Sequence, residues 1–156
     1  MKKTVLVLVA IIFSSVQLFA QSEDDYIEIV REVLKTEKKA VIAEVMELSS
    51  TESAPFWELY NEYNFELSKI LNQRVALIKD FAANYDNITD EKADELWSSM
   101  LSYQQQLLKL KKSYYKKFKK IIPAGKAAMY FQAENKIEAM VNATLAMEIP
   151  FIETKW

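Results

Sequence analysis

The stretch that decides the fold is Phe56–Phe81, with the sequence FWELYNEYNFELSKILNQRVALIKDF. Large side chains recur along it at alternating steps of four and three residues, at Phe56, Tyr60, Tyr63, Leu67, Ile70, Arg74, Leu77 and Phe81. This spacing places them on one stripe of an α-helix that packs lengthwise against partner helices. The stretch therefore predicts a long amphipathic helix that continues to about Tyr85.

Three further helices are predicted around it, at about Asp25–Leu48, from Thr89 into a lysine cluster, and at about Lys126–Met147. Ser49 and Glu52 have the spacing of a capping box, which would start the long helix. Pro55 leaves Ser53 as a competing start, because proline is tolerated best in the first turn. We expect an all-α, four-helix protein with one domain over residues 21–156.

The composition excludes several classes of function. The 156 residues include no histidine, no cysteine and one glycine, Gly125. A Ser-His-Asp triad, a thiol nucleophile, a disulfide framework and a zinc finger are therefore excluded. A glycine-rich phosphate loop is excluded as well. We expect a protein that is not an enzyme and that carries no cofactor.

The first twenty residues have the pattern of a cleaved signal peptide. Lys2 and Lys3 supply the positive start, Val5–Phe13 the apolar core, and Ala20 a small residue at the cleavage site. The apolar core is shorter than the roughly 20 residues that a membrane-spanning helix needs. We expect export to the periplasm, with residues 1–20 removed and no stable membrane anchor.

Charge is segregated along the chain. Residues 23–95 carry 18 acids and 8 bases, whereas residues 96–133 carry 8 lysines and no acid. Helical spacing aligns Lys109, Lys112, Lys116 and Lys120, and Leu108 and Tyr115 lie outside the seam of the same helix. These lysines and Tyr115 form a candidate client-binding strip. The competing interpretation is a solvated face whose lysine stems cover a neighbour, with Tyr115 at a dimer contact. Nucleic acid is not expected as a partner, because the rest of the exported chain is acidic.

The acidic residues and Arg74 offer weaker candidates. Two series of glutamates repeat at four-residue steps, Glu58, Glu62 and Glu66 in one and Glu134 and Glu138 in the other. Carboxylates could hold a hard cation or form an acid/base pair. The spacing favours exposed stripes instead, so we expect no metal site. Arg74 interrupts an apolar seam, and we expect it to pair with a carboxylate or a helix C-terminus.

Two five-residue segments resemble the motifs of a known family. Leu48-Ser49-Ser50-Thr51-Glu52 is similar to the Leu-Thr-x-x-Gln motif of the periplasmic Spy/CpxP-like proteins, with capping chemistry preserved by Ser49 and Glu52. The second motif falls at Ile122-Pro123-Ala124-Gly125-Lys126, where Pro123 cannot supply a capping hydroxyl. The resemblance covers roughly Val41–Pro150. It implies an elongated hairpin-type protomer that pairs into a cradle-shaped antiparallel homodimer.

The resemblance also implies a function in envelope stress. Family members act as ATP-independent chaperones, as accessory inhibitors of a sensor kinase, or as metal-responsive proteins. Without imidazole or thiolate ligands, the metal-responsive role is disfavoured here. We expect a chaperone-like protein that binds unfolded envelope proteins. The alternative is a regulatory accessory protein that binds one envelope stress sensor.

Overall fold

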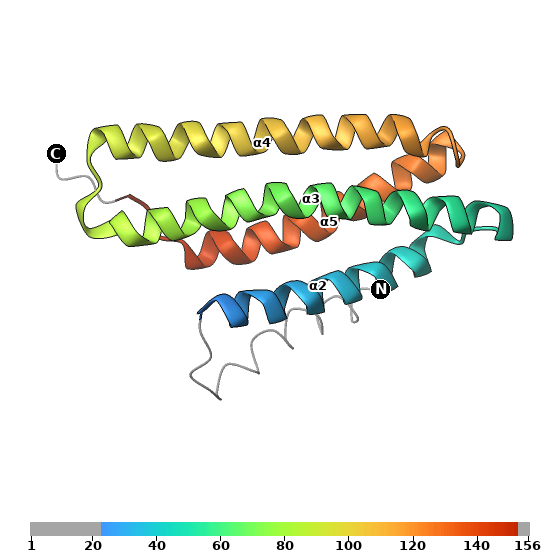
Figure 1. Ribbon diagram of the computed structural model, residues 1–156, viewed down its shortest axis with the longest axis horizontal. Helices are drawn as coiled ribbons and strands as arrows, with labels where there is room; N and C mark the ends of the chain where they lie inside the picture. The colour runs from blue at the N-terminus through green and yellow to red at the C-terminus, as the bar shows by residue number, and fades with distance from the viewer. Residues whose placement is uncertain (1–22, 153–156) are drawn as a thin grey trace. The chain divides into compact units, whose positions relative to one another are not determined.

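The computed structural model describes the backbone of residues 23–152 and the side chains of residues 35–152. Over this range the chain forms four α-helices and one short 3-10 turn, without a strand (Figure 1). The all-α, four-helix prediction is therefore confirmed. The predicted signal peptide, residues 1–20, lies outside the described residues. No helix in the described part is long and apolar enough to cross a membrane.

Over the described residues the chain divides into two units, residues 23–47 and residues 48–152. The first unit contributes helix α2 (Glu23–Met46). Glu47 follows it with a φ of 41°. A left-handed residue directly after the last helical one is a common helix stop, so α2 ends two residues before the predicted Leu48.

The second unit begins with the long helix α3 (Ser50–Asn84). The Glu52 amide donates to Ser49 Oγ at 3.3 Å, and the Ser49 amide donates to Glu52 Oε2 at 2.9 Å. These two reciprocal hydrogen bonds are the predicted capping box. They show that α3 is capped by Ser49 and does not start at Ser53. Pro55 consequently lies inside the helix, beyond its first turn.

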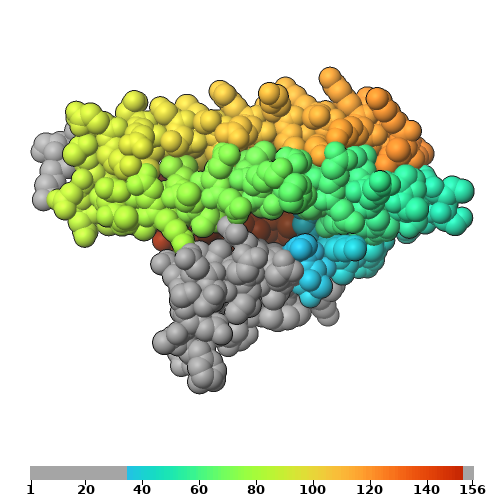
Figure 2. Space-filling model, viewed as in Figure 1, coloured from blue at the N-terminus to red at the C-terminus, as the bar shows by residue number. Residues whose placement is uncertain are grey.

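A 3-10 turn, η1 (Tyr85–Asn87), connects α3 to α4 (Asp90–Phe118). Thr89 caps α4 as predicted, because its side chain accepts from the Lys92 amide at 3.2 Å. The two helices run antiparallel and pack side by side along their length (Figure 1). In the space-filling view, side chains from the C-terminal half of α4 project from the edge away from α3 (Figure 2).

Helix α5 (Ala124–Glu148) turns back from the end of α4 and starts two residues before the predicted Lys126. Its N-cap residue, Pro123, makes no side-chain capping bond, as the sequence predicts. Near this turn the core is aromatic. The Phe118 ring centroid lies 5.3 Å from Phe56, 4.7 Å from Tyr130 and 5.8 Å from Phe131. Rings from three helices thus fix the end of the unit that carries the lysines.

Candidate functional site

The candidate site is the lysine face, which we define as Lys109, Lys112 and Lys116 of α4 together with Lys120 in the turn after it. All four side chains are exposed. Lys109, Lys112 and Lys116 are three or four residues apart, so they follow one face of α4, and Lys120 continues the cluster in the turn after the helix. Within residues 35–152 none of the four forms an ion pair. Their positive charge is therefore available to a partner.

Other lysines of α4 are neutralised inside the unit. Lys117 Nζ donates to Glu62 Oε1 of α3 at 2.7 Å, and the Tyr114 hydroxyl donates to the same oxygen at 2.9 Å. Lys117 therefore holds the pKa of the Glu62 carboxyl below its usual range, with help from Tyr114. Lys111 pairs with Glu138 of α5 and donates to Asn135 Oδ1 at 2.8 Å. These bonds connect α4 to α3 and α5. Lys111 and Lys117 therefore have a structural role that the lysines of the lysine face do not have.

Exposed apolar side chains precede the lysine face along α4, and the last of them, Leu108, adjoins it. We call Trp97, Leu101 and Leu108 of α4 the apolar stripe. Their exposed fractions are 64%, 41% and 53%. Leu108 precedes Lys112 by four residues, about one helical turn, so the two side chains are neighbours on the helix surface. A charged strip and an apolar strip therefore run along the same solvent-facing side of α4.

Tyr115 contributes to this surface only in part. Its side chain is half-buried, and its ring centroid lies 5.9 Å from that of Phe131 on α5. Lys119 Nζ stands 5.0 Å from the centre of the Tyr115 ring. Tyr115 therefore packs against α5 while keeping one edge toward solvent.

The motif residues form a structural joint rather than a binding surface. Leu48 is half-buried, and Ser49 and Glu52 make the capping box. Lys126, the last residue of the second motif, donates from Nζ to Glu52 Oε2 at 2.6 Å. This bond is the largest of the interactions that lower the pKa of the Glu52 carboxyl to about 2. The last residues of the two motifs thus meet as an ion pair.

The prediction that Glu134 and Glu138 lie on an exposed stripe is wrong for Glu134. Its exposed fraction is 5%, because it occupies the position seven residues after Ala127 on the buried face of α5. Burial chiefly, together with the Glu134 charge, raises the pKa of Tyr60, Tyr63 and Tyr130. In the described part of the chain no three carboxylates gather in a group suited to a metal ion.

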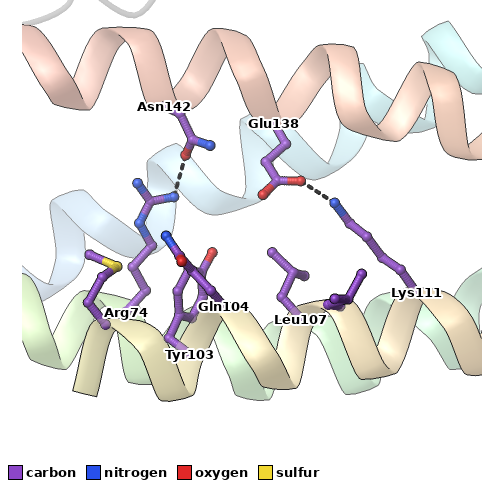
Figure 3. A pocket seen from close by; sticks show the side chains of 9 residues that line it. Arg74, Tyr103, Gln104, Leu107, Lys111, Glu138 and Asn142 are labelled. Carbon is purple, nitrogen blue, oxygen red and sulfur yellow. Dashed lines mark hydrogen bonds and ion pairs between the residues drawn. The ribbon is translucent and has the colours of Figure 1, made fainter. Parts of the chain in front are cut away.

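Sequence reasoning did not find a groove that lies between α5 and the α3–α4 pair (Figure 3). Its volume is about 440 Å³, and it is lined by Arg74, Met100, Tyr103, Gln104, Leu107, Leu108, Lys111, Glu138 and Asn142. Arg74 Nη1 donates to Asn142 Oδ1 at 2.6 Å. The expected carboxylate or helix C-terminus as its partner is therefore wrong. The only feature of the sequence that pointed to this groove was Arg74, a charged residue in the otherwise apolar seam of α3.

Comparison of the chain with protein-family models, with curated proteins and with solved structures gave no match. We therefore base the proposed function on the surface of α4 and on the motif resemblance.

Proposed function

We propose that this protein is a periplasmic, ATP-independent chaperone-like protein that binds unfolded envelope proteins through the lysine face and the apolar stripe of α4. The observation that carries the proposal concerns α4 and the turn after it. Four lysines there are exposed and make no ion pair inside the described unit, and α4 also exposes Leu101 and Leu108. The resemblance to the Spy/CpxP-like motifs supports the same class of function and the homodimer expected with it.

In this proposal the lysines attract the client from a distance, and the exposed apolar side chains contact it. Lysines that are not neutralised attract acidic segments of an unfolded chain over distances of about 10 Å at roughly 0.1 M salt. Exposed leucines then offer contact area to apolar segments that a folded protein would bury. Each contact is weak, so the client is held and released without nucleotide.

Aggregation of reduced α-lactalbumin, followed by light scattering without nucleotide, tests the proposal. We expect the protein without residues 1–20 to suppress scattering and the triple variant Lys109→Gln, Lys112→Gln, Lys116→Gln to suppress it much less. The matched control is Lys39→Gln, Lys69→Gln, Lys136→Gln, which removes three exposed positive charges elsewhere. No suppression at several-fold excess would contradict the proposal, as would equal loss in the two triple variants.

A pull-down from envelope extracts separates this function from the regulatory alternative. A chaperone captures many unfolded chains, and the captured amount increases after heat or acid stress. Capture of one membrane protein in fixed ratio, without suppression of aggregation, would favour the accessory protein of an envelope stress sensor.

A further inference from the structure

The groove beside Arg74 has an unbalanced charge. Of the three charged side chains that line it, Lys111 and Glu138 neutralise each other as an ion pair. Arg74 donates to the neutral amide of Asn142 and forms no ion pair within the described residues. One positive charge is therefore left over, and partly buried charges are rarely left without a counter-ion.

A second donor lies beside this cation. Tyr103 is only 5% exposed, yet its hydroxyl has no hydrogen-bond partner among the described residues, and neither has Arg74 Nε. The Arg74 guanidinium carbon lies 5.6 Å from the centre of the Tyr103 ring. Figure 3 shows both side chains directed from α3 and α4 toward α5, into the groove. Burial raises the pKa of Tyr103, with Arg74 opposing the shift, so the hydroxyl remains a proton donor at neutral pH.

The remaining lining of the groove is apolar. Met100, Leu107 and Leu108 of α4 line it alongside the polar groups. A volume of about 440 Å³ lies within the roughly 300–1,000 Å³ typical of small-molecule sites. Methionine adapts its shape to irregular ligands, which suits a flexible chain.

We propose that this groove binds a monocarboxylate with an unbranched apolar chain, such as a medium-chain fatty acid. Arg74 and Tyr103 hold the carboxylate, because guanidinium N–H groups and a phenol O–H can each donate to one of its oxygens. The chain of the ligand lies along Met100, Leu107 and Leu108. Only one positive charge is unbalanced and Glu138 stands nearby, so a monoanion fits better than a dianion such as phosphate. The groove contains no residue of the lysine face, and it shares Leu108 with the apolar stripe.

Isothermal titration calorimetry of the purified protein with sodium octanoate tests the proposal. We expect saturable binding of octanoate, with 1-octanol and acetate each binding at least about tenfold more weakly, because each lacks one half of the recognised chemistry. Inorganic phosphate should bind no better than acetate. Equal affinity for octanoate and 1-octanol would overturn the proposal, and so would phosphate binding as tightly as octanoate.

Two variants assign the carboxylate contacts. Arg74→Gln should weaken octanoate binding by about tenfold or more, and Tyr103→Phe by about three- to tenfold, with affinity for 1-octanol unchanged. The control Lys69→Gln removes a positive charge of α3 that pairs with Glu66 outside the groove, and it should bind octanoate like the wild type. Should Arg74→Gln fail to fold by circular dichroism, Tyr103→Phe still decides, because it removes one hydroxyl and leaves the buried ring in place. Octanoate affinity unchanged in Tyr103→Phe, or in a folded Arg74→Gln, would overturn the assignment.

Discussion

Ser49 is the N-cap of α3, and its cap should stabilise the second unit. Its side chain accepts from the Glu52 amide, and its own amide donates back to Glu52. We expect Ser49→Ala to lower the free energy of unfolding by about 1 kcal/mol, the usual cost of losing a helix cap. Urea unfolding followed by circular dichroism measures this. The matched control is Ser50→Ala, one residue further into α3, which should change the value by less than about 0.5 kcal/mol. Equal effects would contradict the capping role.

Glu52 should give this joint a dependence on pH. Its carboxyl titrates near 4.5 in an unfolded chain, and in the folded protein Lys126 and Ser49 lower the pKa to about 2. A lowered folded pKa stabilises the protein above the unfolded pKa, and the contribution is lost as the pH falls through the folded pKa. We expect wild type to be more stable than Glu52→Gln above about pH 4.5, with the difference vanishing toward pH 2.

Urea unfolding at a series of pH values between 2 and 7 measures the difference. The control is Glu58→Gln on the exposed side of the same helix, which also removes one acidic charge. A constant difference between wild type and Glu52→Gln across this range would show that Lys126 and Glu52 do not interact in solution.

At the scale of the helices, the aromatic contacts among α3, α4 and α5 hold the end that carries the lysine face. Phe118 contacts rings from the other two helices at centroid distances of 5.3 and 4.7 Å. We expect Phe118→Ala to lower the free energy of unfolding by about 3–5 kcal/mol, because it leaves a cavity among them. Leu108→Ala on the same helix should cost less than about 0.5 kcal/mol, since that side chain is largely exposed. Denaturant unfolding compares the two, and similar costs would contradict the packing described.

Helix positions could be predicted from sequence because caps and apolar periods are local. The start of α3 follows from Ser49 and the start of α4 from Thr89. The apolar period of α3 follows from its own phenylalanine and tyrosine residues. What sequence could not supply depends on distant residues. Glu52 meets Lys126, and Arg74 meets Asn142, across separations of 74 and 68 positions. The prediction placed Glu134 on an exposed stripe because the residue is charged. The structure buries it, on the face of α5 that meets tyrosines from α3.

For the molecule as a whole, the distribution of charge should govern how clients are captured. Paired lysines such as Lys117 join α4 to α3, and the lysine face remains free to attract acidic chains. We expect affinity for reduced α-lactalbumin to fall as salt is raised from 0.1 M to 1 M, because the screening length shortens from about 10 Å to about 3 Å. Fluorescence anisotropy of a labelled client measures this, with the triple variant of Lys109, Lys112 and Lys116 as the control that should respond little. Equal salt dependence in the two proteins would contradict an electrostatic role for the lysine face.

The central claim is that α4 is where unfolded chains bind, and site-specific photocrosslinking tests it most directly. A photoreactive amino acid placed at Lys112 lies in the lysine face, one helical turn after Leu108. One placed at Asn72, an exposed position of α3, is the matched control. With reduced α-lactalbumin present, we predict abundant client crosslinks from position 112 and few from position 72. Equal crosslinking at both positions, or none at position 112, would contradict the account.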